Sequence, residues 1–245
     1  MSLNEKIGSQ IEDPADKRRY VRGLFGGIAE RYDLTNDVMS LGLHRRWKAR
    51  TLDLADIRPG QRVLDLAAGT ADLGRMALTS TGGDLEVVAA DLTPEMLRVG
   101  KHRPGPGLLG WVGADASQLP FGDASFDRVL VGYGLRNFAN LSACLGEILR
   151  CLVPGGRFAS LDFGRPPLAP VRGAYLAYLE VSTRVVGWAL HRNPESYVYI
   201  PESLRRFPGQ RGVKLAMEHA GYENCVSVDV MAGTMGINTG DRPSP

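Results

Sequence analysis

The stretch RVLDLAAGTADLG, residues 62–74, decides how this chain folds. Its apolar first part, residues 62–66, is typical of a buried β-strand, and the small residues 67–71 are typical of a turn before a helix that begins near Ala71. Small residues let the backbone approach a ligand closely, and the helix points its first N–H groups at that ligand. Asp65 lies inside the strand, where a carboxylate is costly unless it binds something. The stretch therefore predicts the cofactor-binding turn of a doubly wound α/β domain.

The composition is that of an ordinary globular protein. The 245 residues are 44% hydrophobic and 23% charged, and the net charge of +2 gives no reason to expect a nucleic-acid partner. Cys144, Cys151 and Cys225 share no CxxC spacing, which indicates reduced core thiols of a cytoplasmic protein and no metal site. The N-terminus lacks the apolar core of a signal peptide, and no uncharged apolar run reaches the ~20 residues that span a bilayer. We expect a cytoplasmic protein.

Strand and helix patterns alternate after residue 60. We expect strands at 62–67, 86–91, 109–114, 126–133 and 156–163, helices at 71–80, 94–102 and 140–152, then a helix at 211–220 and strands at 222–231 and 233–240. Short apolar strands separated by helices predict a parallel sheet. The tight turn at Ala232 and Gly233 predicts an antiparallel last pair. A mostly parallel seven-stranded sheet that ends in an antiparallel hairpin is the plan of the class I S-adenosylmethionine (SAM) methyltransferases, a Rossmann-like α/β fold.

We expect one domain, residues 1–245, with two helical additions. Residues 1–58 form an N-terminal cap, in which residues 1–20 are polar and poorly ordered before a helical segment near 20–29. Residues 165–210 interrupt the alternation with two helices and a Pro-rich connection. This insert is placed to act as a lid over the carboxyl edge of the sheet.

Acidic residues end three successive strands, at Asp65, Asp91 and Asp115. Asp91 can accept hydrogen bonds from both ribose hydroxyls of an adenosyl group, which SAM and NAD share, or it can cap the next helix. Asp115 and Ala116 follow the third strand, where an adenine amino group would lie, although Asp115 could also form a turn. An acid followed by LPF and a strand beginning with FD is typical of SAM enzymes. The incomplete GxGxxG motif points the same way, because SAM has no pyrophosphate.

The segment after the fourth strand, VGYGLRNFAN at residues 131–140, excludes several methyl acceptors. It lacks the Asn/Asp-Pro-Pro-aromatic motif of enzymes that methylate amino groups of nucleic acids. It also lacks the Pro-Cys nucleophile of cytosine C-methylation, and it offers no carboxylate cluster for a metal ion. We therefore expect a small-molecule acceptor that is methylated without a metal.

Three longer segments carry family-specific motifs: FGGIAERYDLTNDVMSLGLHRRWK (25–48), GLRNFANLSACLGEILRCLVPGGRFASLDFGRP (134–166) and SYVYIPESLRRFPGQRGVKLAMEHAGYENC (196–225). The chain resembles the ubiquinone/menaquinone biosynthesis C-methyltransferases of the UbiE/MenG type over most of residues 25–240. The resemblance implies SAM-dependent methylation of a ring carbon of a prenylated quinol, either demethylmenaquinol or a methoxy-benzoquinol. With the family contacts carried over, the predicted cofactor-binding residues are Asp65, Ala67, Gly69, Thr70, Asp91, Leu92, Asp115, Ala116 and Gly132.

The chain departs from the family pattern at three places. Residues 68–71 read AGTA where the family usually has GGTG, Gly132 stands where Ser is common, and Asn238 follows Ile237 where an apolar–His–x–Gly run is usual. These departures leave the cofactor class intact. Gly132 and Asn238 keep open another hydroxylated aromatic or secondary metabolite as acceptor. Two separate alternatives are a non-catalytic scaffold in a quinone-synthesis complex and, more distantly, a nicotinamide oxidoreductase.

Methylation of a ring carbon needs electron density on that carbon, which an ortho hydroxyl supplies once its proton is lost or shared. Arg136 is our candidate for stabilising the resulting quinolate, with Asn137 fixing its geometry, unless the two residues only cap the following helix. His44 is a second candidate base, although a histidine in this setting is more often a packing residue. Tyr197 and Tyr199 are candidates for lining the ring pocket.

Two further segments bear on partners. The helix candidate at 174–190 carries an apolar stripe that either packs against the core, guides a polyprenyl tail or touches a membrane. The basic residues 17–22 form a solvated face or a contact with anionic lipid. We expect a lipophilic quinol as partner and no nucleic acid, and we hold open a homodimer and a peripheral contact with the inner face of the membrane.

Overall fold

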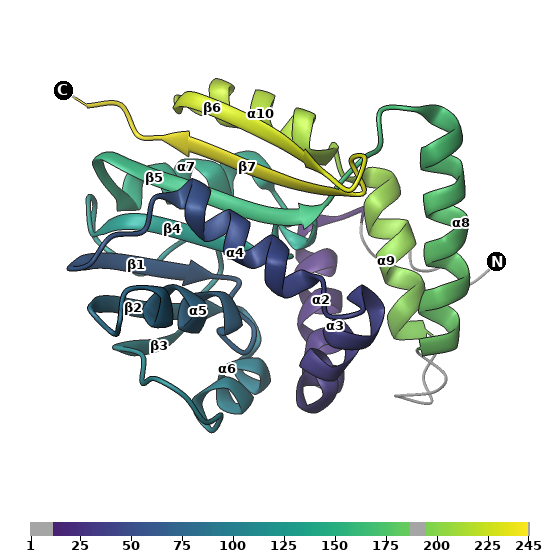
Figure 1. The fold of residues 1–245 in the computed structure, drawn as a ribbon, viewed down its shortest axis with the longest axis horizontal. Helices are drawn as coiled ribbons and strands as arrows, with labels where there is room; N and C mark the ends of the chain where they lie inside the picture. Colours follow the sequence, from purple (N-terminus) through teal and green to yellow (C-terminus); the bar gives the residue numbers. More distant parts are fainter. Residues whose placement is uncertain (1–11, 187–194, 245) are drawn as a thin grey trace.

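A seven-stranded sheet forms the centre of the molecule (Figure 1). The computed structural model describes residues 12–186 and 195–244. The strands are β1 (Gln61–Leu66), β2 (Leu85–Asp91), β3 (Gly110–Gly113), β4 (Phe126–Gly132), β5 (Leu152–Phe163), β6 (Glu223–Val230) and β7 (Met235–Asp241). They lie in the order β3-β2-β1-β4-β5-β7-β6, and β7 runs antiparallel to both of its neighbours. The predicted mostly parallel sheet with an antiparallel last hairpin is confirmed.

The central strands form where the sequence is apolar on both faces. In β1 and β2 every residue after the first two is buried, as a parallel sheet covered on both sides requires. Leu66 of β1 lies opposite Ala90 of β2, and Asp65 lies opposite Leu130 of β4. The carboxyl ends of these three strands therefore meet at one edge of the sheet, where open parallel sheets bind their ligands.

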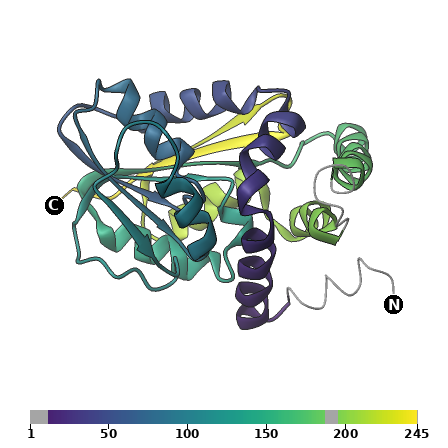
Figure 2. The same cartoon turned by 90° about the horizontal axis from the view of Figure 1, so that it is seen from below.

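Helices cover both faces of the sheet (Figure 2). They are α4 (His44–Ala55), α5 (Asp72–Ser80), α6 (Pro94–Lys101), α7 (Leu141–Cys151) and α10 (Gly209–His219), with the short 3-10 helix η2 (Leu135–Asn137) after β4. Apolar residues of α4 and α5 join one core cluster with Val63 and Val87. Those of α7 and α10 join a second cluster with Leu64 and Val129. Alternate residues of β1 thus face opposite layers.

The N-terminal addition consists of α2 (Pro14–Ile28), the 3-10 helix η1 (Ala29–Arg31) and α3 (Tyr32–Ser40), which lead into α4. The expectation that order begins near residue 20 was wrong. Helix α2 begins at Pro14, where the Asp13 carboxylate accepts hydrogen bonds from the N–H groups of Ala15 and Asp16. Proline in the first turn and an acidic N-cap are both strong helix-start signals.

The insert forms the two expected helices, α8 (Ala169–Val186) and α9 (Glu195–Arg206). Figures 1 and 2 show α2 and α3 at the carboxyl end of the parallel strands, between the sheet and the α8–α9 pair. Residues 187–190 of the predicted apolar stripe lie outside the described residues. Among the helices that are described, none is long and apolar enough to cross a membrane.

Strand β5 begins four residues earlier than predicted. The sequence predicts a helix to residue 152 and a strand from residue 156, but pairing with β4 already starts at Leu152, opposite Phe126. The register then shifts, so that Arg128 faces Arg157. Gly155, at φ 73°, allows the intervening residues to bulge out of the ladder.

Candidate active site

The turn after β1 is built from left-handed residues. Ala67, Gly69 and Ala71 have φ values of 51°, 56° and 59°, and α5 begins at Asp72 directly afterwards. Left-handed alanines cost of order 1–3 kcal/mol each and persist only where the surroundings hold them. Gly69 has little room for a side chain, since a Cβ there would lie 2.9 Å from Met96 Cε. Ala67 and Gly69 of this turn line one side of a cavity.

Asp91 fixes this turn from the end of β2. Its Oδ2 accepts the N–H of Gly69 at 2.7 Å, and its Oδ1 accepts the N–H of Thr93 at 2.8 Å. Burial raises the pKa of this carboxyl, and the two backbone hydrogen bonds oppose that rise. The carboxyl group also lines the cavity that the turn borders.

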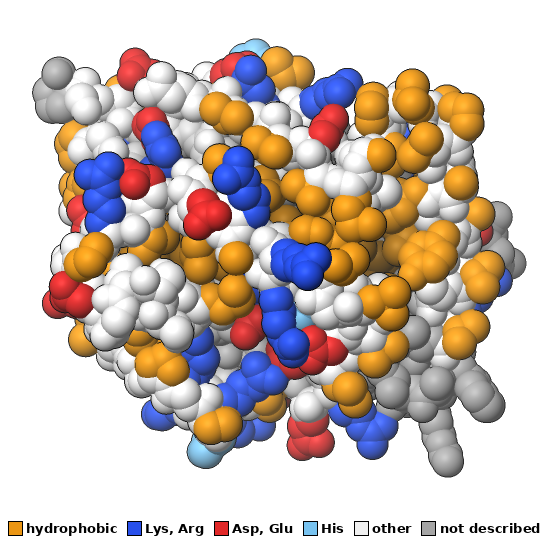
Figure 3. Space-filling view, viewed as in Figure 1, with side chains coloured by type: hydrophobic (Ala, Val, Ile, Leu, Met, Phe, Trp, Pro, Cys, Tyr) orange, Lys and Arg blue, Asp and Glu red, His pale blue; other side chains and the backbone are white. Residues whose placement is uncertain are grey.

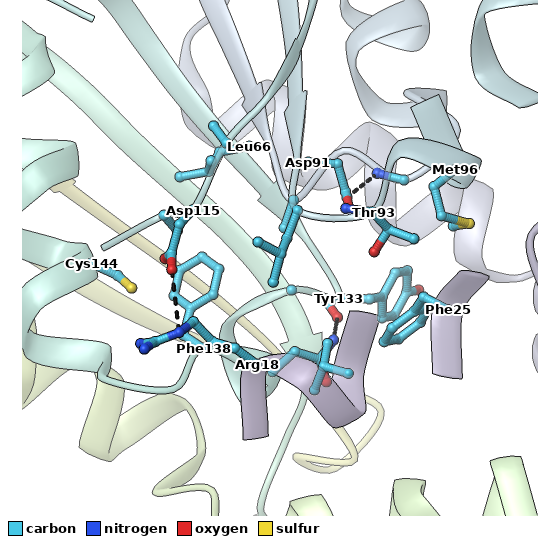
Figure 4. Close-up of a pocket in the computed structure, with 18 of the residues that line it drawn as sticks. Arg18, Phe25, Leu66, Asp91, Thr93, Met96, Asp115, Tyr133, Phe138 and Cys144 are labelled. Carbon is cyan, nitrogen blue, oxygen red and sulfur yellow. Dashed lines mark hydrogen bonds and ion pairs between the residues drawn. The ribbon is translucent and has the colours of Figure 1, made fainter. Parts of the chain in front are cut away.

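Asp115 lies on the opposite wall. Its Oδ1 accepts hydrogen bonds from the backbone N–H and the hydroxyl of Ser117, and its Oδ2 forms a 3.5 Å ion pair with Arg18 Nε (Figure 4). Arg18 belongs to α2, so the N-terminal addition forms part of this wall. The sequence indicated only that Arg18 faces solvent or contacts anionic lipid, and its ion pair with Asp115 was not predicted.

These groups surround a first cavity with an empty volume, including its opening to solvent, of about 730 Å³. The structure brings together eight of the predicted site residues in its lining: Ala67, Gly69, Asp91, Leu92, Asp115, Ala116, Gly132 and Asn137. Phe25, Met96 and Phe138 add apolar walls (Figure 4).

Asp65 and Thr70 do not line this cavity. The buried Asp65 carboxylate accepts the N–H of Gly74, in the first turn of α5, at 2.8 Å, and burial raises the pKa of Asp65 to about 7. We therefore correct its role from cofactor contact to support of the α5 terminus. The Thr70 hydroxyl donates to Asp33 at 3.0 Å and accepts from Arg103 at 3.3 Å, which ties the turn to α3.

A second cavity lies between α3, α4, α8 and α9, with an empty volume, including its opening to solvent, of about 1700 Å³. Apolar and aromatic side chains dominate its walls, among them Met39, Trp47, Phe163, Tyr175 and Leu179. Figure 3 shows hydrophobic side chains gathered on this side of the molecule, around a hollow beside α8. Such a cavity fits an apolar ligand several times longer than one ring.

Arg136 is the buried cation in this second cavity. Its side chain and that of Asp162 in β5 are each 5% exposed, and Arg136 Nη1 lies 2.8 Å from Asp162 Oδ1. Burial alone would lower the pKa of Arg136, but the neighbouring Asp162 carboxylate raises it, so the guanidinium stays charged. The guanidinium lies over the Phe163 ring at 4.8 Å, and its buried Nε has no hydrogen-bond partner. An unpaired buried donor is costly unless a ligand accepts it.

Asn137 holds the segment next to Arg136. Its Nδ2 donates to the carbonyl of Tyr133 at 3.2 Å, and its Oδ1 accepts the hydroxyl of the fully buried Tyr199 at 2.9 Å. Lys17 of α2 donates to the carbonyls of Arg136 and Phe138 at 3.0 and 2.7 Å. Asn137 and Arg136 thus act in one network that spans α2, η2 and α9.

The remaining candidates take different positions. His44 lines the second cavity, but its Nε2 pairs with Asp37 at 2.8 Å and its Nδ1 is buried without a partner. Tyr199 also lines the second cavity, and burial raises its pKa well above the ordinary tyrosine value. Tyr197 belongs to α9, but its side chain lies outside the described part of the structure. His44 therefore does not line the first cavity.

The two cavities meet at Phe25, Tyr32 and Tyr133, which line both. Tyr133 adopts φ 62°, a rare conformation for a bulky residue, and its ring packs at 5.8 Å from that of Phe163. Its carbonyl accepts hydrogen bonds from Arg136 Nη1 at 2.6 Å and from Asn137. Sequence reasoning missed Tyr133 and Asp162. The lone acid in the apolar run FASLDF is the signal that could have identified Asp162.

A sequence model of the ubiE/COQ5 methyltransferase family matches residues 13–242. The chain belongs to this family. A Teredinibacter turnerae protein named ubiquinone/menaquinone biosynthesis C-methyltransferase UbiE is 38% identical over 96% of this chain and 96% of its own length. A demethylmenaquinone methyltransferase of Beutenbergia cavernae is 40% identical over 93% of this chain and 91% of its own length. This chain is thus a SAM-dependent methyltransferase.

Solved structures support the fold of this ubiE/COQ5 family member. A SAM-dependent methyltransferase from Aquifex aeolicus superimposes with a TM-score of 0.56 at 15% identity, covering 80% of this chain and 89% of that chain. A Haemonchus contortus phosphoethanolamine N-methyltransferase 2 in complex with SAM gives a TM-score of 0.57 at 16% identity, and the match covers 81% of this chain and 53% of that chain. At these identities the likeness establishes the class I methyltransferase fold alone.

The cofactor fits the first cavity of the structure. The left-handed turn and the buried Asp91 carboxylate border one cavity, which is how adenosyl groups are held in Rossmann-like folds. Gly132 leaves this wall without a polar side chain, and a Cβ there would meet Leu73 at 3.4 Å. The departure at Gly132 thus removes a hydroxyl and does not block the cavity.

Proposed function

We propose that this chain transfers a methyl group from SAM to a ring carbon of a prenylated quinol, either a demethylmenaquinol or a methoxy-benzoquinol. One observation carries the proposal: the second cavity is large and apolar, and it holds a buried guanidinium whose Nε lacks a partner. A hydroxylated ring, one hydroxyl of which can ionise beside the guanidinium, with a long hydrocarbon tail matches that combination. The names of the two relatives support the same class of acceptor.

The residues of the first cavity would hold SAM, which supplies a methyl group on a positively charged sulfur. Asp91 lines this cavity at the end of β2, and its carboxylate would accept the ribose hydroxyls. Asp115 and Ala116 would contact the adenine. Phe25, Tyr32 and Tyr133 lie between the cofactor and the acceptor, where the methyl group must cross.

Arg136 makes the acceptor reactive. A fixed positive charge beside a ring hydroxyl lowers the pKa of that hydroxyl, and the ionised oxygen raises the electron density on the adjacent carbon. The raised pKa of Arg136 means that the guanidinium stabilises the anion and does not take up its proton. Neutralisation of the carbon's charge by the methyl group is favoured in apolar surroundings.

The proton leaves to water in this proposal, directly or through a chain of waters. Asp37 pairs with His44 Nε2 at 2.8 Å, so that nitrogen is not free to take the proton. His44 therefore holds α3 against α4, while Asn137 positions Arg136 through the shared Tyr133 carbonyl.

Quinols with zero to three isoprene units test the proposal in a turnover assay. We expect kcat/KM to rise over the first units, because the tail gains apolar contact in the cavity at roughly 25 cal/mol per Å². Ala174→Glu, in the cavity wall, should abolish that rise. Ala177→Glu, exposed on the same helix, is the matched control and should keep it. Equal turnover of the tail-less ring would favour another hydroxylated aromatic as acceptor.

A further inference from the structure

Exposed apolar side chains are concentrated around the second cavity. Eleven large hydrophobic residues are exposed in the described part of the chain, and eight belong to α3, α8 or the segments beside them. We call these eight residues the apolar rim: Leu34, Val38, Leu41, Leu168, Tyr178, Val181, Val185 and Met231. Leu41, Tyr178 and Met231 also line the cavity itself. Figure 3 shows groups of hydrophobic side chains over and beside α8.

Helix α8 connects the cavity with the rim. Val171, Ala174 and Tyr178 line the cavity, and they recur at helical spacing with the exposed Val181 and Val185. One face of the helix is therefore a cavity wall in its first half and an exposed stripe in its second. Apolar side chains on this face thus extend from the second cavity to the surface.

The charges beside the rim have one prevailing sign. Arg46 follows α3 at the start of α4, and Arg184 lies between Val181 and Val185, and both side chains are exposed. The nearby acidic groups are occupied in ion pairs: Asp33 with Arg103, Asp37 with His44 and Arg45, and Glu180 with Arg205. Apolar side chains flanked by arginines suit a surface of anionic lipid, where each basic residue adds about 1 kcal/mol.

We propose that the apolar rim docks this protein on an anionic lipid bilayer, so that the acceptor cavity opens toward the hydrocarbon. The inference rests on the proposed function, because a prenylated acceptor resides in lipid and would otherwise have to cross water. A second copy of the chain fits this face less well. Pairing two rims would bring arginines of like charge together and would close both cavity mouths.

Co-sedimentation of the full chain with phosphatidylcholine/phosphatidylglycerol vesicles tests the proposal. Val38→Glu/Val181→Glu changes two rim residues that do not line the cavity. The variant loses two valine side chains that would be buried in the bilayer and gains two negative charges, so vesicle binding should weaken roughly tenfold or more. The matched control is Leu109→Glu/Leu215→Glu, which alters two equally exposed leucines outside the rim and should bind like the wild type.

Activity separates this proposal from the proposed function. The rim variant should methylate a tail-less quinol in solution at the wild-type rate, yet methylate a prenylated quinol in vesicles roughly tenfold more slowly. Wild-type vesicle binding by the rim variant, or no binding by the wild type, would overturn the docking proposal. So would a wild-type dimer in sedimentation that the rim variant dissociates. If vesicles bind as expected but no quinol is methylated, the proposed function fails and the docking surface stands.

Discussion

Replacing Arg136 by glutamine should reduce both stability and rate, and the two losses can be separated. Arg136 and Asp162 form a buried ion pair in which each side chain is 5% exposed. Without the guanidinium, the Asp162 carboxylate still accepts hydrogen bonds from the backbone N–H of residue 136 at 3.1 Å and of Phe163 at 2.8 Å. It has, however, lost its counter-charge. Breaking a buried pair from one side costs roughly 3–5 kcal/mol. Urea unfolding should report a loss of that size.

The double variant Arg136→Gln/Asp162→Asn isolates the catalytic part of the effect. Two neutral amides can hydrogen-bond to each other, so most of the lost stability should return. Turnover should stay roughly 10²–10³-fold low, because the charge that stabilises the quinolate is still missing. The pH–rate profile should also move to higher pH, since the quinol hydroxyl must ionise without a neighbouring cation.

Three measurements on each variant complete this test: urea unfolding, SAM binding by calorimetry and single-turnover methyl transfer. SAM affinity should barely change, because Asp91 and Asp115 are untouched. Arg19→Gln is the control for charge removal, since its pair with Asp16 is exposed and should contribute at most about 1 kcal/mol. Normal turnover in the stable double variant would refute the role of Arg136 and leave it as a structural residue.

Three further predictions concern the turn and the junction between the cavities. Asp91→Ala should weaken SAM binding at least tenfold in calorimetry, because charge-assisted hydrogen bonds contribute roughly 1.5–3 kcal/mol each; an unchanged Kd would remove the ribose contact. Tyr133→Ala should lower kcat roughly 10²-fold through misplacement of the reacting groups, while Tyr133→Phe should keep most of it, and the reverse ranking would point to the hydroxyl. Burial raises the pKa of Asp65 to about 7, above its unfolded value, so its contribution to stability is full below about pH 4 and is lost as pH rises toward 7. In Asp65→Asn, the free energy of unfolding should no longer fall by up to roughly 4 kcal/mol between pH 4 and 8, as measured by urea unfolding. The same pH dependence in the variant and the wild type would contradict this prediction.

The fold could be predicted from the sequence because its signals are local. Residues 62–74 contain a strand, a turn and a helix start in one stretch, and Asp91 and Asp115 each end a neighbouring strand. Parallel strands bring such ends to a common edge whatever the loops between them do. Once the strands were placed, most of the first cavity followed.

The contacts that could not be predicted join residues far apart in the chain. Lys17 donates to carbonyls 119 and 121 residues away, and Arg18 reaches Asp115, although both side chains read as part of an ordinary basic face. Nothing in the local pattern of α2 distinguishes a solvated lysine from one whose pKa is lowered to about 8, chiefly by burial. Asp65 shows the converse problem. A buried acid must have a partner, but the sequence does not distinguish a ligand from the Gly74 N–H.

The left-handed Tyr133 explains how the two cavities are coupled. Its N–H donates a hydrogen bond to the carbonyl of Leu161 in β5 at 2.6 Å, while its own carbonyl accepts hydrogen bonds from the side chains of Arg136 and Asn137. An extended residue here would continue β4 and carry that carbonyl away from both side chains. Gly134 permits the turn, because a Cβ there would lie 2.7 Å from the Cβ of the left-handed Ala67. The left-handed backbone of Tyr133, which lines both cavities, therefore holds Arg136 in the wall of the second cavity.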